Sequence, residues 1–255
     1  MTAQTPQQRT GDSKVTERMA AEWSPRSKAR VAGIFYLLEA LTAVFGQLYV
    51  PGMLVVSGDA AATTTNILGN ELLFRLSLAA TLIAVACHIV WVLLFYDLFK
   101  PVNRSLSLLA AFFGLVAIAL QAVSSVFQHA PLVVLRGGGS LSAFTTDQLQ
   151  ALALMFLQMK AQTFNIYLVF FGFWCVLIGY LIFRSTFLPR IIGWLVALAG
   201  LSYLMLLWPP LVNYLAPYNL ALAAPGEISL LLWLLVVGVN DQRWKEQARA
   251  AIVKE

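Results

Sequence analysis

The chain contains few charged residues, and this scarcity decides its class. Asp, Glu, Lys and Arg together make up 11% of the 255 residues, whereas hydrophobic residues make up 60%. The mean hydropathy is +0.76. This number of charges is too small to cover the surface of a soluble globular protein. Most of the chain is therefore expected to lie in lipid.

Cysteine and histidine occur only twice each, which argues against a metal or haem protein. Cys87 and Cys175 lack the ligand spacing of a zinc site, and lone membrane cysteines usually act as small apolar residues. His88 and His129 are expected to differ in depth by about 20 Å, too far to share one iron. The sequence has no Gly-rich phosphate loop either. We therefore expect no metal and no cofactor.

The positive charge of the chain is distributed as an orientation signal. Fourteen of the 17 lysines and arginines fall in the two terminal tails and in two short turns, 100–104 and 184–190. Only Arg75, Arg136 and Lys160 fall on the other side. By the positive-inside rule both termini are expected in the cytoplasm. Because the charge forms no patch, nucleic acid is not expected as a partner.

Six apolar stretches are each long enough for a helix that crosses the membrane. They predict an all-α polytopic membrane protein, a bundle of six transmembrane helices. We expect residues 1–28 to form a disordered cytoplasmic tail without a cleaved signal peptide, 29–240 the six-helix domain, and 241–255 a cytoplasmic amphipathic tail. The six stretches are 30–50, 72–98, 105–131, 163–184, 190–212 and 218–239.

Two connections on the outer side are long. Asp59 is expected to cap a short interfacial helix that ends near Gly69. After the flexible break at 136–140, a helix is expected to start at Thr146 and to continue unbroken through Phe183. Because the inner turns are short, we expect the open end, where a ligand enters, to be the outer one.

Four segments of the chain carry a fairly specific combination of residues: Gly58–Thr63 with Asn66–Leu68, Leu73–Leu76, Lys100–Arg104, and Gly179–Ser185 continuing through Phe187–Arg190 to Gly200. Together they resemble a bacterial membrane family, the domain of unknown function number 4386. The resemblance covers about residues 30–240. It implies the fold and the topology but no activity. It also implies an acidic residue in the middle of the second helix, where this chain has His88.

Polar side chains inside the lipid carry the chemistry that remains to be interpreted. At about 1.5 Å per residue, Glu39 and His88 reach the same depth, about 15 Å from the cytoplasmic ends of their helices. The other candidates for a pocket lie farther out: Glu227, Gln121, Gln47 and Asn165.

Glu39 is the first candidate for a functional group. A carboxylate at the midplane costs several kcal/mol if it is ionised and isolated, so it must be protonated, paired or hydrated. His88 is its expected partner, within about 6 Å. Two interpretations remain open for Glu39: a titratable functional acid, or a residue that only holds helices together by hydrogen bonds. For His88 considered alone, a buried histidine without function is favoured.

One face of the fourth helix changes from amides outside to small residues inside. Gln158, Gln162 and Asn165 are followed by Gly172 and Gly179 at spacings typical of one helix face. This face is expected to point inward. It indicates either the wall of a polar cavity or ordinary small-residue packing, with packing slightly favoured.

Arg75 is expected at the outer face. It lies about 14 Å from Glu227 in depth, which makes an ion pair between them difficult. Contact with lipid headgroups or the outer loop is favoured over contact with an anionic ligand.

These observations favour a protein that binds or passes a small lipophilic molecule through an outward-facing polar pocket, with Glu39 as a titratable group. One alternative is a membrane-embedded enzyme that acts on a lipid or isoprenoid-like substrate, with Glu39 as the acid. Another is a non-catalytic accessory or assembly subunit, whose polar residues only hold helices together. The expected partners are membrane lipids and a small lipophilic ligand, with a further membrane protein as a candidate.

Overall fold

A computed structural model of the chain describes residues 23–215 and 218–252, and all regular structure in this part is helical. Most of the predicted disordered tail, residues 1–22, lies outside the described residues, as do residues 253–255 of the C-terminal tail. The first helix begins earlier than expected, at Pro25. Ser24 caps it by accepting a hydrogen bond from the backbone N–H of Ser27 (3.1 Å), and a proline is well suited to the first helical position.

Within the described residues, five helical segments are long and apolar enough to cross a membrane. They are Pro25–Leu54 (α2, Pro25–Ala43; the π-helical η1, Val44–Tyr49; and α3, Val50–Leu54), α5 (Glu71–Phe99), α6 (Arg104–Arg136), α7 (Thr146–Arg184), and α8 (Arg190–Leu204) with η3 (Met205–Leu207). The chain is therefore an all-α polytopic membrane protein. Shorter helices complete the described part: α4 (Ala60–Gly69), η2 (Gly139–Ala143), α9 (Pro209–Leu215), α10 (Tyr218–Ala221), α11 (Ala224–Val236) and α12 (Asp241–Ile252).

The last two crossings differ from the expected stretches. The helix expected over 190–212 breaks after Leu207, because Trp208, which precedes Pro209, takes a non-helical conformation (φ −124°, ψ 84°). The single helix expected over 218–239 is divided into α10 and α11. By length and composition α11 forms a sixth span only together with α12, and these two helices are bent by 103°.

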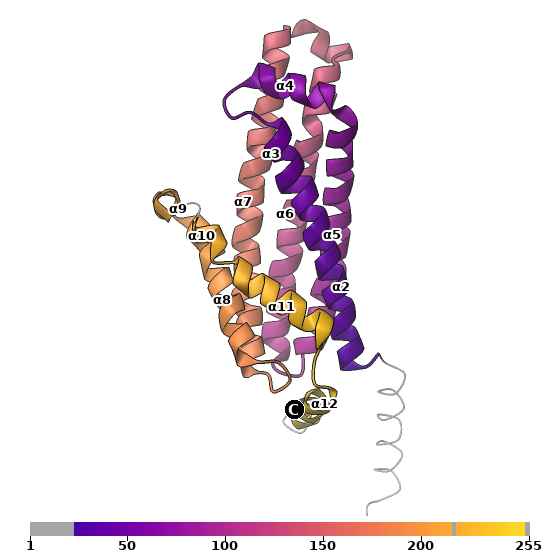
Figure 1. Ribbon diagram of the computed structural model, residues 1–255, viewed down its shortest axis with the longest axis vertical. Helices are drawn as coiled ribbons and strands as arrows, with labels where there is room; N and C mark the ends of the chain where they lie inside the picture. The colour runs from indigo at the N-terminus through magenta and orange to yellow at the C-terminus, as the bar shows by residue number, and fades with distance from the viewer. Residues whose placement is uncertain (1–22, 216–217, 253–255) are drawn as a thin grey trace, which may run out of the picture.

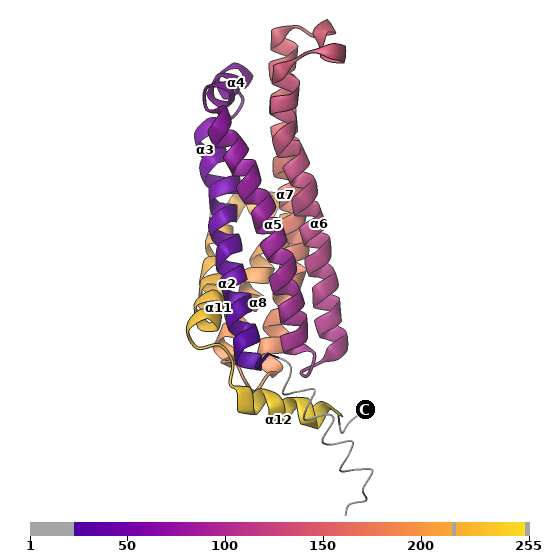
Figure 2. The ribbon, with the colours of Figure 1, turned by 90° about the vertical axis from the view of Figure 1, so that its right-hand side faces the viewer.

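The long helices α2, α5, α6 and α7 run side by side along the molecule (Figures 1 and 2). Helices α8 and α11 lie beside the lower part of this bundle, and α9 and α10 diverge from it at mid-height (Figure 1). The first described helix starts at the same end at which α12 lies across the base of the bundle (Figure 2). The first and the last described helices therefore lie at the same end of the bundle, as the predicted even number of crossings requires.

The helices α4 and α7 begin where the sequence predicts. Asp59 accepts a hydrogen bond from the backbone N–H of Ala62 (2.8 Å) at the start of α4, which ends at Gly69. Thr145 and Gln148 form a capping box at the start of α7. Helix α7 then continues unbroken to Arg184. These predictions are confirmed.

Glycines bring α7 and α8 into close contact. A Cβ atom added to Gly179 would lie 2.7 Å from the backbone nitrogen of Ala197 and 2.7 Å from the carbonyl oxygen of Gly193. At Gly172 the carbonyl oxygen of Gly200 would lie 3.0 Å away. The prediction that Gly172 and Gly179 pack against a neighbouring helix is therefore confirmed.

The outer part of the same α7 face does not point inward. Gln158, Gln162 and Asn165 are exposed, which corrects the expectation. The reason is the length of α8: it ends at Leu204 and therefore does not reach the outer half of α7.

Helix α12 confirms a helix in the predicted amphipathic tail and shows what its apolar side contacts. The indole N–H of Trp244 donates a hydrogen bond to the carbonyl of Leu98 (2.8 Å) at the inner end of α5. Gly238, with φ +73°, forms the sharp joint between α11 and α12, a conformation that favours glycine. Trp244 thus holds α12 against the base of the bundle.

Candidate functional site

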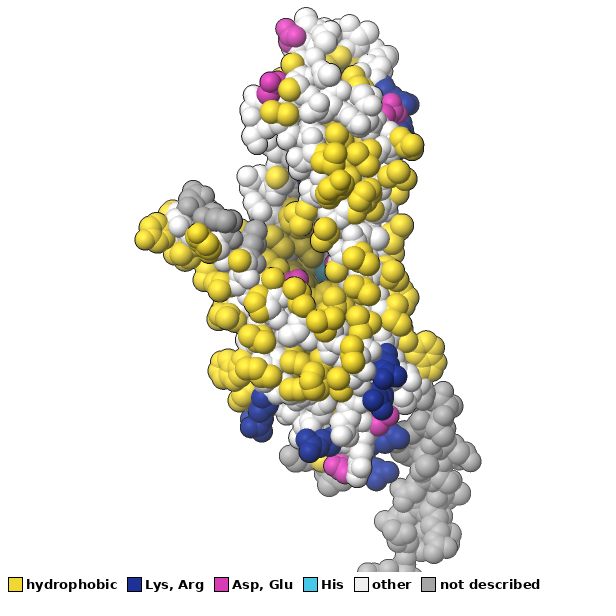
Figure 3. Space-filling view, in the orientation of Figure 1, with side chains coloured by type: hydrophobic (Ala, Val, Ile, Leu, Met, Phe, Trp, Pro, Cys, Tyr) yellow, Lys and Arg dark blue, Asp and Glu magenta, His cyan; other side chains and the backbone are white. Residues whose placement is uncertain are grey.

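A recess of about 170 Å³ lies between α2, η1, α6, α7, α8 and α11. Four of the predicted site residues line it together: Glu39, Gln47, Gln121 and Glu227. The rest of its wall is aromatic or aliphatic and comprises Tyr36, Ala40, Ala43, Val44, Leu48, Phe164, Tyr167, Leu168, Phe171 and Tyr203. In Figure 3 the recess is the hollow near the middle of the molecule, with acidic and histidine atoms visible in its depth.

The mouth of this recess is on the side of the bundle. Hydrophobic side chains surround the hollow in Figure 3, and the lining residues Val44 and Leu48 are 53% and 61% exposed. The expectation of a pocket that opens at the outer end therefore requires correction. The physical reason is that α8 and α11 are short and lie beside the lower part of the bundle (Figure 1): α8 ends at Leu204 and α11 begins at Ala224, so the recess lies where these helices end.

Glu39 and His88 meet inside the bundle. Oε1 of Glu39 lies 3.3 Å from Nδ1 of His88, an ion-pair distance without hydrogen-bond geometry. The other carboxylate oxygen, Oε2, accepts a hydrogen bond from the indole N–H of Trp91 (3.2 Å). The expected meeting of Glu39 and His88 is thus confirmed. His88 is fully buried and stacks on Trp91 with ring centroids 4.4 Å apart, so it lies behind the carboxylate and does not line the recess.

Glu227 provides a second carboxylate in the same wall. The hydroxyl of Tyr203 on α8 donates a hydrogen bond of 2.5 Å to Oε1 of Glu227 on α11. The charged residues of the wall are therefore both acids, and neither is paired with a lysine or arginine of the described part.

Two amide groups in the wall have unused hydrogen-bonding capacity. Nε2 of Gln47 and Oε1 of Gln121 are buried and lack hydrogen-bond partners among the described residues. Buried polar groups without partners cost free energy, which a bound polar group or water would recover. The recess therefore offers an amide donor and an amide acceptor in addition to two carboxylates.

The π-helical segment η1 shapes the outer edge of the recess. Gln128 on α6 donates a hydrogen bond to the carbonyl of Gly46 (3.1 Å), and the ammonium of Lys160 on α7 donates to the carbonyl of Gln47 (3.3 Å). Both partners come from other helices. A Cβ atom on Gly46 would lie 2.5 Å from the carbonyl oxygen of Ser77, so only glycine permits this approach of η1 to α5. Such π-helical turns are frequent at functional sites.

Two predicted site residues lie away from the recess. Asn165 is exposed and does not line it. Arg75 forms an ion pair with Glu71 (Nε to Oε1, 2.8 Å), and Arg136 reaches the same carboxylate oxygen (2.5 Å). This outer cluster already supplies Arg75 with an acidic partner from its own chain.

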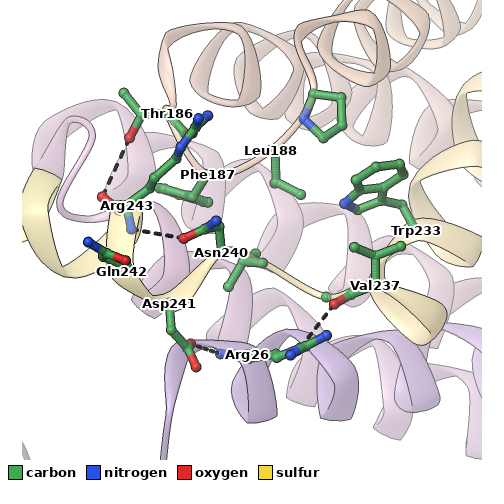
Figure 4. Close-up of a pocket in the computed structure, with 13 residues that line it drawn as sticks. Arg26, Thr186, Phe187, Leu188, Trp233, Val237, Asn240, Asp241, Gln242 and Arg243 are labelled. Carbon is green, nitrogen blue, oxygen red and sulfur yellow. Dashed lines mark hydrogen bonds between the residues drawn. The ribbon is translucent and has the colours of Figure 1, made fainter.

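A wider groove of about 560 Å³ is present at the inner end. Figure 4 shows that its polar groups bind one another. The backbone N–H of Arg26 donates to Oδ1 of Asp241 (2.7 Å), its Nε donates to the carbonyl of Val237 (3.2 Å), and the N–H of Arg243 donates to Asn240 (3.0 Å). The groove is thus the joint that fixes α12 to the bundle.

Several residues of the site were not singled out from the sequence. Tyr203 and Trp91, which bind the two acids, resemble any other aromatic residue of an apolar stretch. From the sequence Lys160 is only an outer positive charge, and Gln128 is one of several amides in the apolar stretches. A signal was available for these two, because polar groups inside apolar helices usually have partners there.

Fold and site together define a multi-pass membrane protein with an acid-lined recess in its side. The family model described as a domain of unknown function (DUF4386) matches residues 31–238. The chain belongs to this family, as its sequence segments indicate. No curated protein and no solved structure matches the chain.

Proposed function

We propose that the protein binds a small lipophilic molecule in the recess, and that this molecule enters sideways from the bilayer of a bacterial inner membrane. One observation supports the proposal best: four polar side chains from α2, η1, α6 and α11 line one recess with an apolar rim. They are Glu39, Gln47, Gln121 and Glu227. Ligand pockets typically combine an apolar lining with a few convergent polar groups.

The chemistry of the wall favours binding over helix packing alone. Polar groups that only hold helices together are expected to satisfy one another, as Gln128 and Gly46 do. In the recess, by contrast, Gln47 and Gln121 keep unpartnered atoms within the described part of the chain. A ligand with a polar end would bind these groups and leave its apolar part against Val44 and Leu48.

Native mass spectrometry of the purified protein in a neutral detergent tests this proposal. The protein is incubated with 1-dodecanol, whose chain matches the apolar rim and whose hydroxyl can reach the amides. Bound 1-dodecanol should be detected in the wild type. It should be lost in Ala43→Phe, because a phenyl ring on this lining residue fills the recess.

The matched control is Ala79→Phe, the same substitution at an exposed position of α5. It should bind as the wild type does. Equal binding by both variants would show that the alcohol associates with the outer surface, and the proposed function would be wrong.

The Glu39–His88 pair favours a second candidate, an enzyme that acts on a lipid or isoprenoid-like substrate. A carboxyl group with a histidine at 3.3 Å can donate a proton to a bound molecule, and the histidine can stabilise the carboxylate that results. Incubation of the protein with membrane lipid extract should then give a new product that is absent with Glu39→Gln. The distribution of basic residues supports cytoplasmic termini for either function.

A further inference from the structure

The lining of the recess contains two acidic side chains and no lysine or arginine. Its charged lining residues are Glu39 and Glu227, and His88 is the group that faces Glu39 from behind. The buried Lys160 donates to the carbonyl of Gln47 and makes no ion pair with an acid of the described part. A ligand that carries a positive charge would therefore balance the wall, whereas an anionic ligand would meet repulsion.

The aromatic part of the wall has the same preference. Tyr36, Phe164, Tyr167, Phe171 and Tyr203 line the recess next to the acids. Their rings contact one another: the centroids of Tyr167 and Phe171 are 5.8 Å apart, and those of Phe171 and Tyr203 are 5.7 Å apart. Aromatic faces attract ammonium groups, and such attraction is strongest where water is excluded.

A free hydrogen-bond acceptor also suits an ammonium group. Oε1 of Gln121 lacks a donor among the described residues, and Gln121 is only 1% exposed. An ammonium group has N–H donors and no acceptor. The unpartnered Oε1 of Gln121 is a second observation, separate from the two acids. It indicates that a bound molecule supplies a hydrogen-bond donor at this place.

From these observations we infer that the ligand is a lipophilic amine, a molecule with one protonated amino group and an apolar tail. The amino group binds between Glu39 and Glu227 among the aromatic rings, and the tail leaves through the mouth lined by Val44, Leu48 and Leu168. A volume of about 170 Å³ suits a small headgroup, with the tail remaining in the lipid. The inference rests on the proposed function and adds the chemical class of the ligand.

The test compares three probes that share one tail: dodecylamine, 1-dodecanol and dodecanoate. Their binding to the protein in a neutral maltoside detergent is measured by isothermal titration calorimetry at pH 7. Dodecylamine should bind at least about tenfold more tightly than 1-dodecanol, because a desolvated carboxylate and several rings favour the cation. Dodecanoate should bind most weakly.

The variant Glu39→Gln/Glu227→Gln should reduce the preference for the amine to about onefold. Its affinity for 1-dodecanol should stay within about twofold of the wild type, which also shows that the recess is intact. Glu227→Gln alone retains an acceptor for Tyr203 and should lower the preference for the amine over the alcohol several-fold. This single variant tests the inference if the double variant does not fold. The control Glu246→Gln makes the same charge change on the exposed face of α12 and should leave the preference unchanged.

Two results would overturn the inference. One is equal binding of amine and alcohol by the wild type; the other is a preference for the amine that persists without both acids. In either case binding of 1-dodecanol that Ala43→Phe abolishes would leave the proposed function in place. If none of the probes responds to Ala43→Phe, both the function and the ligand class are wrong.

Discussion

Replacing Gly179 by alanine should destabilise the contact between α7 and α8. The added Cβ atom would lie 2.7 Å from the backbone nitrogen of Ala197, 2.7 Å from the carbonyl oxygen of Gly193 and 2.9 Å from the Cβ of Ala197. Non-bonded heavy atoms prefer about 3.5–4.0 Å, so the helices must separate by about 1 Å. The atoms that must give way are mostly backbone, which cannot rotate aside.

The magnitude follows from two opposing effects. Inserting a methyl group into a well-packed interface costs about 1–3 kcal/mol. The higher helix propensity of alanine returns up to about 1 kcal/mol. A net loss of about 1–2 kcal/mol corresponds to a fall of about 2–8 °C in the midpoint of thermal unfolding for a chain of this size.

The assay is thermal unfolding of the purified protein in detergent, with Gly52→Ala as the matched control. Gly52 is helical, and a Cβ atom there would meet nothing within 4 Å. Both variants gain the same propensity, so the difference between their midpoints isolates the packing effect. A Gly179→Ala midpoint equal to or above that of Gly52→Ala would refute the close packing of α7 on α8.

Two further predictions concern the orientation and the η1 segment. In intact cells, a membrane-impermeant maleimide should label Thr65→Cys on α4 but not Gln242→Cys on α12, because the distribution of basic residues predicts that α12 is cytoplasmic. The native Cys87 and Cys175 are buried, so they should add little background. Reversed labelling would show that the predicted topology is inverted. Gln128→Leu should lower the free energy of unfolding by about 1–3 kcal/mol, because it removes the donor to Gly46 and Ser77. Ser125→Ala, which removes a hydrogen bond within α6 alone, should cost clearly less in the same thermal assay, and equal losses would count against the interhelical role of Gln128.

The features that the sequence predicted well depend on local chemistry. The cap at Asp59, the uninterrupted α7 and the small residues at Gly172 and Gly179 follow from rules that involve a few neighbouring residues or one helix face. The pairing of Glu39 with His88 was accessible for a different reason. Two ionisable groups at the same depth in lipid have few other partners, so their shared depth was sufficient to predict the contact.

The features that depend on neighbouring helices were harder to predict. Gln158, Gln162 and Asn165 continue the inward face of α7 by period, but these three side chains are exposed and α8 ends at Leu204. Periodicity identifies which residues share a face, whereas the length of the next helix decides whether that face is covered.

The recess itself arises where the helical pattern fails. Trp208 precedes Pro209 and Pro210, so α8 and η3 end below the outer half of the bundle, and the next long helix, α11, starts only at Ala224. A full-length fifth helix would continue along α7 and cover Gln162 and Asn165. Because it stops, the flank between α2 and α7 stays open beside Glu39 and Glu227, on the apolar side of the molecule (Figure 3). The residues that end the helix therefore shape the site together with the acids that line it, because among the described residues α8 and η3 stop before they would cover that side.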